Sequence, residues 1–441
     1  MRGVLKLASR QATNLGHGSR FGGLGCLKSS RVSPFINLST NTGEAGDFQN
    51  PIVSQLWSMR AEAKAFHEST SPSSTPTTYS SFSTPRPPSY SSCSISYPFT
   101  SNPFLRETYR SPWDEVRIGK ILEDLDACAG NICFKHAVMG GKWEAPLIVT
   151  AGIDRVRVMK RPTVDEDMEL EGSISWVGSS SMEITMRVKG EVIGTWLEAA
   201  FTFVARDKST HKAAKIVALE PETEEEKESF ERGRIRAETK KKVRKMAAEQ
   251  SAYTLEVEKK ARLALNSAMS MQKMPSLAPP DQVLMSQTEL HNAFTAQPQQ
   301  RNMHNRIFGG FLMRRAFELA FATAYNFGGC KPRFVEVDDI SFLTPVDVGD
   351  LLVYHSKVIY TLPDGGGLNL DGGSNPLVMV EVDAFVQEPN VYESHLSNKF
   401  HFTFSLPNQD TCKRIVPDNM DDAKRQVKRM IEDERQAGII D

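Results

Sequence analysis

GKILEDLDACAGNICFKH, residues 119–136, is the stretch that decides the fold, together with the runs that follow it. Its apolar side chains recur with a spacing of about 3.6 residues, which predicts an amphipathic helix. They are Ile121, Leu122, Leu125, Ala129, Ile132 and Cys133. Runs rich in Val, Ile, Thr, Phe and Trp follow, with glycine-containing breaks, at 146–159, 168–177, 182–188 and 195–205. This order predicts an α+β unit in which one helix packs on an antiparallel sheet.

The same order of elements returns in the second half of the chain. A helix is predicted at 310–325, and strands are predicted at 333–343, 351–361, 377–387 and 399–406. The two helices open at Gly119 and Gly310, 191 positions apart, and Pro162 and Pro345, each five residues before an Asp, lie 183 positions apart. Nearly constant offsets are what the duplication of one unit leaves. Two such units can pack edge to edge and cover strands that each would otherwise expose.

The composition disfavours several classes of function. Lys plus Arg (53) nearly equals Asp plus Glu (54), so we expect no nucleic-acid partner and no membrane-surface binding. No apolar run reaches the length of about 18 residues that a membrane span needs. The six Cys form no Cys-x-x-Cys pair and the nine His no His-Glu-x-x-His motif, so we expect reduced thiols, no metal and no cofactor. A Gly-x-Ser-x-Gly elbow, which would mark a serine hydrolase, is also missing.

The segments around the two units differ from them in composition. Residues 1–68 begin basic, Ser-containing and free of acid before Glu44, which is typical of an organellar transit peptide and leader, although an untargeted disordered tail can look the same. Residues 69–104 are rich in Ser, Thr, Pro and Tyr and predict a disordered spacer. The other predicted segments are a first domain at 105–219, a charged helical linker at 220–281, a second domain at 282–410 and a charged helix or tail at 411–441.

Four motifs carry a resemblance to a known family. They are VRIGKILEDLD (116–126), SWVGSSSME (175–183), NRIFGGFLM (305–313) and VDDISF (337–342). From about residue 109 to 406 the chain resembles the double-hotdog acyl-CoA thioesterases, in particular the mitochondrial acyl-coenzyme A thioesterase nine type. The resemblance implies two tandem hotdog domains, each a long central helix wrapped by an antiparallel sheet. It also implies an acyl-CoA substrate, a mitochondrial or plastid location and a homo-oligomer of such protomers.

Asp126 lies on the apolar stripe of the first predicted helix, four residues after Leu122 and three before Ala129. Glu123 and Asp124 are predicted to lie off that stripe. A carboxylate among apolar side chains is either functional or a marginal residue that reaches solvent, and spacing alone leaves both interpretations open. The family's acid stands seven residues after the glycine that opens the helix. The resemblance therefore implies that Asp126 is catalytic.

The second repeat is expected to supply the rest of the site. The resemblance implies Asn305 as a carbonyl polariser, with the amides of Gly309 and Gly310 at a helix N-terminus that favours developing negative charge. In many family members the asparagine stands three residues before the first glycine, where this chain has Arg306. Either the turn is one residue longer here, or Asn305 has another role such as capping the helix.

One composite site is predicted because each repeat lacks what the other has. The second repeat has Phe317 at the position that Asp126 holds in the first. Glu318, its neighbour, is expected to form an ordinary i, i+4 pair with Arg314. The first repeat has no Asn before Gly119 that would match Asn305.

Anchoring of the CoA phosphates is predicted from a basic edge. Arg155 and Arg157 alternate with valines on a predicted strand, and Arg306 precedes the glycine turn, although such arginines are commonly ordinary solvent-facing residues. Competing interpretations are an acyl-carrier-protein thioesterase, a hydratase, or a catalytically inactive acyl-CoA-binding protein. A hydratase normally has a His near its acid, whereas His136 lies ten residues from Asp126, almost three helical turns away.

The basic, acid-free start of the chain generates a targeting prediction. A fusion of residues 1–68 to a fluorescent protein is expected to enter an organelle, the mitochondrion first, because import machinery reads such basic amphipathic leaders. Fluorescence microscopy checks this against the same fluorescent protein without the segment. Uniform cytosolic fluorescence of the fusion would contradict it.

Overall fold

Two long helices and the strands around them form the core of the described chain. The computed structural model describes residues 84–138, 146–249, 251–274, 278–302, 306–365 and 375–440, together with Val53, Leu56 and Ser276. The transit peptide predicted within 1–68 therefore lies almost entirely outside the described residues. The central helices are α3 (Ile118–Ala137) and α6 (Gly309–Gly328), which match the helices predicted at 119–136 and 310–325.

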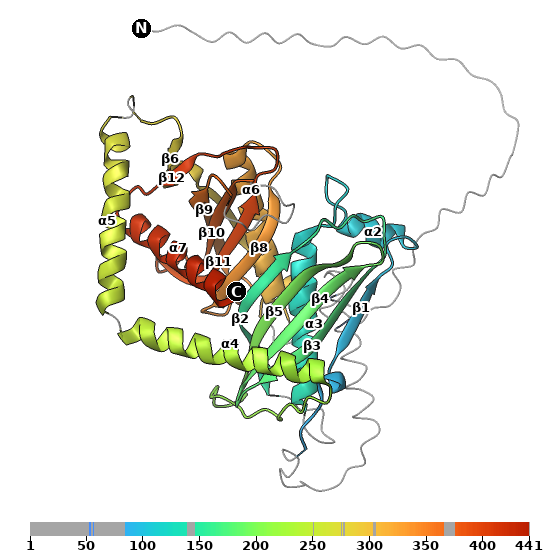
Figure 1. Cartoon of the computed structure of the whole chain (residues 1–441). Helices are drawn as coiled ribbons and strands as arrows, with labels where there is room; N and C mark the ends of the chain where they lie inside the picture. The colour runs from blue at the N-terminus through green and yellow to red at the C-terminus, as the bar shows by residue number, and fades with distance from the viewer. Residues whose placement is uncertain are drawn as a thin grey trace, which may run out of the picture. The chain divides into compact units, whose positions relative to one another are not determined.

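Each helix is followed by four long strands (Figure 1). The first repeat has β2 (Leu147–Val158), β3 (Met168–Val177), β4 (Ser181–Gly190) and β5 (Gly194–Arg206). The second has β8 (Arg333–Phe342), β9 (Leu351–Leu362), β10 (Leu377–Glu388) and β11 (Glu393–Ser405). A short strand precedes each helix, namely β1 (Cys93–Tyr97) and β7 (Leu290–Thr295). The predicted helix-then-strands repeat is confirmed.

The strands of both repeats form one continuous antiparallel sheet. Within the described chain this sheet has ten strands in the order β1-β3-β4-β5-β2-β8-β11-β10-β9-β7. The order reads the same from either end when each strand is replaced by its counterpart in the other repeat. The repeats meet at β2 and β8, where Val156 pairs with Val337 and Ile153 with Ile340. The two halves are thus related by an approximate two-fold axis between β2 and β8, and each covers the edge strand of the other.

The central helices approach one another closely and run antiparallel. A Cβ added at Gly310 would lie 2.9 Å from the carbonyl oxygen of Glu123, and one at Gly119 would lie 3.1 Å from Cγ of Arg314. A side chain at Gly310 would therefore push against backbone, which cannot yield without moving α3. The glycine at the start of each helix is what allows the other helix to pack against it.

One expectation about α3 is wrong. Glu123 and Asp124, predicted off the buried stripe, are 1% and 0% exposed. Periodicity allows for one buried face, but α6 packs on a second face and the segment before α3 covers a third. Asp124 accepts hydrogen bonds from the hydroxyls of Tyr97 (3.0 Å) and Tyr109 (2.5 Å), so its burial is compensated.

The disordered spacer predicted for 69–104 is also wrong in its last part. Residues 93–97 form strand β1, which pairs with β3, with Ile95 opposite Leu170. Tyr97 and Phe99 are fully buried, and α2 (Pro103–Tyr109) follows. Serine-rich composition conceals this strand, because its alternate residues Ile95 and Tyr97 supply the apolar face while the serines between them face outward.

The predicted charged linker and C-terminal segment form long helices that cover other elements. Figure 1 shows α4 (Glu224–Glu249) beside the first repeat, where Arg236 donates to the buried carboxylate of Glu183. Next, α5 (Ser251–Lys273) packs against α7 (Met420–Ile440) through an apolar cluster. In turn α7 places Arg429 within 2.7 Å of the buried Asp338 of β8. Short strands β6 (Gln282–Leu284) and β12 (Arg414–Val416) pair in parallel. No helix in the described ranges is long and apolar enough to cross a membrane.

The shared sheet generates a prediction about the two halves. Residues 84–249 and 278–440, produced separately, are expected to be insoluble or inactive, because each exposes its edge strand (β2 or β8) and the helix face that the other half buries. Gel filtration and activity of the soluble fraction measure this. Coexpression of both halves is the matched control and should return a soluble complex. A single half that is soluble, unfolds cooperatively and is active would contradict the prediction.

Candidate active site

Asp126 of α3 contacts the first turn of α6 across the boundary between the repeats. Its Oδ2 accepts a hydrogen bond of 2.7 Å from the backbone N–H of Gly310, and its Oδ1 accepts one of 3.2 Å from the hydroxyl of Thr150 on β2. The side chain is only 3% exposed. The interpretation of Asp126 as a marginal, solvent-reaching residue is therefore wrong, because the carboxylate is buried and held by both repeats.

The glycine pair is required by the closeness of this contact. A Cβ at Gly309 would lie 3.1 Å from Oδ2 of Asp126 and 3.2 Å from the ring of Phe342. Phe308, which caps α6, offers no side-chain acceptor to the first-turn amides. The amide of Gly310 is free to bond a group from outside the helix, and the α6 dipole favours negative charge at this point.

The protonation of Asp126 is set by its surroundings. Burial raises the pKa of Asp126 to about 6, against the opposing effect of the hydrogen bonds from Gly310 and Thr150, and the negative charge of Glu123 raises it further. A carboxyl group with this pKa is mostly ionised at neutral pH and can still take up a proton during a reaction. These are the properties of a general base or a carboxylate nucleophile.

The corresponding place in the other repeat has no such carboxylate. Phe317 lies against Gly119 at the start of α3, and its ring packs on Phe334 and Phe402 at centroid distances of 5.1 and 5.8 Å. Glu318 lies 3.6 Å from Nε of Arg314, as predicted, but it also pairs more closely with cations of both repeats. These partners are Arg117 at 2.9 Å and Arg315 at 3.2 Å.

Two asparagines, Asn302 and Asn305, precede α6 in the sequence. Asn305 lies outside the described residues, so its predicted role is untested. Asn302 lies within the described residues. Its side-chain Oδ1 accepts a hydrogen bond of 3.2 Å from the backbone N–H of Arg306, and its backbone N–H donates one of 2.6 Å to the backbone carbonyl of Arg306. Asn302 was missed from the sequence, where the only signal is a second amide upstream of the glycine pair in NMHNRIFGG (302–310).

The arginines predicted to bind CoA phosphates have protein partners in two of three cases. Arg155 forms a 2.6 Å ion pair with Glu336 across the β2–β8 junction. Arg306 lies 3.5 Å from Asp347. Arg157 is half-buried, and its Nε has no hydrogen-bond partner among the residues that the structure describes. The role of these arginines in phosphate binding stays a prediction.

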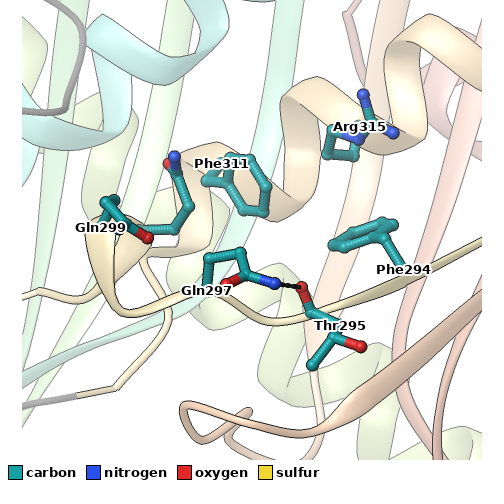
Figure 2. Close-up of a pocket in the computed structure, with 7 residues that line it drawn as sticks. Phe294, Thr295, Gln297, Gln299, Phe311 and Arg315 are labelled. Atoms are coloured by element: carbon teal, nitrogen blue, oxygen red, sulfur yellow. Dashed lines mark hydrogen bonds between the residues drawn. The ribbon is translucent and has the colours of Figure 1, made fainter.

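A cavity of about 620 Å³ lies beside the first two turns of α6 (Figure 2). Its lining comes from the end of β7, the following loop with the 3-10 turn Pro298–Gln300, and α6. The lining residues are Phe294, Thr295, Gln297, Gln299, Gln300, Phe311 and Arg315. Figure 2 shows Phe311 and Arg315 on the helix. The guanidinium carbon of Arg315 lies 5.0 Å from the ring centre of Phe294. Phe311 directly follows Gly310, so the cavity adjoins the turn that holds Asp126.

No group of three or more His, Cys, Asp and Glu that could hold a metal ion occurs among the described residues. The residues gathered at the helix junction are instead a carboxylate, a hydroxyl and a helix-terminal amide. They can polarise a carbonyl group and activate or deliver an oxygen nucleophile.

Comparison with known proteins identifies the family. Acyl-coenzyme A thioesterase 4, mitochondrial, of Humulus lupulus is 41% identical over 87% of this chain and 73% of its own length. Acyl-coenzyme A thioesterase 2, chloroplastic, of the same plant is 40% identical over 87% and 89%. Human acyl-coenzyme A thioesterase 9, mitochondrial, is 36% identical over 70% and 69%. No protein-family model matches the chain.

The chain belongs to the acyl-coenzyme A thioesterases. The two tandem hotdog domains expected from the resemblance are confirmed, since each repeat is a long helix wrapped by an antiparallel sheet. Of these three relatives, two are named mitochondrial and one chloroplastic.

The raised pKa of Asp126 generates a stability prediction. Because the folded pKa is about 6 and an unfolded Asp titrates near 3.9, the folded state binds the extra proton and loses stability as pH rises from about 4 to 6. Asp126→Asn removes the cost of burying the charged carboxylate. The free energy of unfolding of the variant, relative to that of the parent, is therefore expected to be higher at pH 8 than at pH 4 by up to about 3 kcal/mol. Urea unfolding at both pH values measures the difference. An equal effect of the substitution at both would contradict it.

Proposed function

We propose that this chain hydrolyses acyl-CoA thioesters to a free fatty acid and CoA at the composite site between Asp126 and the first turn of α6. The observation that carries the proposal is the buried hydrogen bond from the Gly310 amide to Asp126, which joins an acid of one repeat to a helix N-terminus of the other. Family membership supplies the thioester substrate.

The chemistry follows from charge. Attack on a thioester carbonyl places negative charge on its oxygen. The dipole at the start of α6 stabilises that charge, together with the Gly309 amide, which the hydrogen bond to Asp126 does not occupy. Asp126, ionised above its pKa of about 6, either takes a proton from the attacking water or attacks the carbonyl carbon itself. Both routes begin from the same carboxylate. The thiolate of CoA then leaves and takes up a proton. On the second route, water hydrolyses the anhydride formed between the acyl group and Asp126, which releases the fatty acid and restores the carboxylate. No metal or serine is needed.

A side-chain amide from the turn before α6 is proposed as a second carbonyl polariser. Asn305 is the residue that the family resemblance implies. Asn302 stands three residues earlier and accepts a hydrogen bond from the backbone of Arg306. Either amide would act mainly in the transition state, where the carbonyl oxygen carries most charge.

The cavity beside α6 is proposed to hold a non-reacting part of acyl-CoA. Its two phenylalanines offer apolar surface, while Gln297, Gln299 and Gln300 offer donors and acceptors that match the amides of a pantetheine arm. Arg315 supplies a cation for phosphate. Homo-oligomerisation, expected from the resemblance, stays a prediction for light scattering to test.

Asp126→Asn tests the proposed base or nucleophile. The substitution keeps the size of the side chain and removes its charge, so thiol release from acyl-CoA is expected to fall by about two to four orders of magnitude. A chromogenic thiol assay over a panel of acyl-CoAs measures it, and calorimetry shows whether the variant still binds substrate. A variant that binds and also hydrolyses at the parent rate would contradict the proposal. Binding by the parent without thiol release would favour an inactive acyl-CoA-binding protein instead.

Matched variants sharpen this experiment. Asn305→Ala and Asn302→Ala, made separately, identify which amide lowers turnover more than it lowers affinity. Because the amide and Asp126 act on one reaction centre, the double variant is expected to lose far less than the product of the single losses. Glu318→Gln is the control in the other repeat and should stay within about threefold of the parent. If Glu318→Gln lost hydrolysis while Asp126→Asn kept the parent rate, the working carboxylate would lie in the second repeat, and the proposal would be contradicted.

A further inference from the structure

Glu123 and Arg314 hold the same position in the two central helices. Each stands four residues after the glycine that opens its helix, Gly119 in one and Gly310 in the other. Residues at equivalent positions face each other where antiparallel helices cross at a two-fold axis. Here Nη1 of Arg314 lies 2.8 Å from Oε2 of Glu123, and the side chains are 19% and 2% exposed. The axis between the repeats therefore carries a buried ion pair of unlike residues.

This pair distinguishes the correct pairing of repeats from self-pairing. Two copies of the first repeat would bring Glu123 against another Glu123, and two copies of the second would bring Arg314 against another Arg314. Buried like charges repel strongly and leave each group unpaired. The fused chain replaces that conflict with an attraction, so α3 accepts α6 as its neighbour and not a second α3.

The pair also lies next to the proposed reaction centre. Glu123 is three residues before Asp126, on the adjoining turn of the same helix. Gly310 packs on the backbone of Glu123. A Cβ added at Gly310 would lie 2.9 Å from the carbonyl oxygen of Glu123 and 3.0 Å from its Cα. Any shift of α6 at Arg314, one turn further along, would move the Gly310 amide relative to Asp126.

Asp126 faces polar or charged groups from α6, from β2 and from its own helix. From α6 it meets the Gly310 amide, from β2 the Thr150 hydroxyl, and from its own helix the carboxylate of Glu123. Arg314 supplies the cation bound to Glu123, and Lys120 on α3 lies in the field of both. The charge that Asp126 senses along α3 thus depends on how well Arg314 neutralises Glu123.

We propose that Arg314 is a positioning residue for thioester hydrolysis: through its ion pair with Glu123 it fixes the start of α6 on Asp126 and offsets the negative charge beside Asp126. The proposal rests on the function proposed above and adds a residue that touches neither substrate nor reacting atoms.

Arg314→Met tests positioning. It keeps an unbranched side chain but removes the guanidinium group and its charge, so kcat for acyl-CoA is expected to fall by about ten- to a hundredfold, with KM within about threefold. The control is Lys331→Met, which removes another ion pair between the repeats, Lys331 to Glu115 at 2.5 Å, both of whose residues lie outside the two central helices. That variant should keep parent turnover. Equal losses in both variants, or none in Arg314→Met, would overturn the proposal.

The exchange of the two charges tests the pair itself. Glu123→Arg combined with Arg314→Glu restores an ion pair in the opposite sense and is expected to recover kcat to within about tenfold of the parent, above Arg314→Met. A folded double variant that is no better than Arg314→Met would overturn the proposal. Thermal unfolding of each variant separates loss of fold from loss of turnover.

Glu123→Gln gives a readout that a purely structural role would not move, and it decides the matter if Arg314→Met does not fold. Removing the negative charge beside Asp126, while Arg314 remains, favours the ionised carboxylate, so the acidic limb of the kcat profile is expected to shift to lower pH by about 0.5 units or more. An unchanged limb would overturn the proposal. Asp126→Asn, measured in the same assay, distinguishes failure of this proposal from failure of the proposed function. If the Asp126→Asn variant kept full activity, the proposed function itself would be rejected, and not only the role of Arg314.

Discussion

The close approach of α3 and α6 is the constraint on which the rest of the structure depends. It is possible because Gly119 and Gly310 leave room for the opposite helix. The approach closes the core between the repeats, aligns β2 with β8, and brings a helix N-terminus onto a buried carboxylate. A larger side chain at Gly310 would disturb packing and the proposed chemistry together, because both use the same few ångströms of contact.

The two halves share a fold but not an environment. Asp126 and Phe317 occupy equivalent positions, yet one is held by Gly310 and Thr150 and the other lies among aromatic rings. Asp124 and Arg315 are likewise equivalent, and the first is enclosed by two tyrosines while the second faces a cavity. Divergence has thus acted on side chains around a conserved backbone plan, filling space in one half and opening it in the other.

Much of the fold could be predicted from the sequence, and less of the site. Strands and helices followed from periodicity, so the strand predicted at 168–177 is β3 residue for residue. Strand β1 was missed because two apolar residues in a serine-rich segment give too weak a pattern. The burial of Glu123 was missed because periodicity cannot anticipate a second helix. Asp126 and Gly310 were expected together through the family resemblance. The cavity was not, since its lining comes from separate segments, and Asn305 stays a prediction.

The unequal positions Asp126 and Phe317 have a genetic consequence. In a symmetric dimer of one short chain, every substitution appears twice, so a change that improves one half must be tolerated by the other. In a fused chain each codon affects one half alone. Phe317 and its neighbours can therefore change in favour of packing, while α3 near Asp126 and the start of α6 keep the residues that the proposed chemistry uses. Inherited variants at equivalent positions of the two repeats should differ in their severity for this reason.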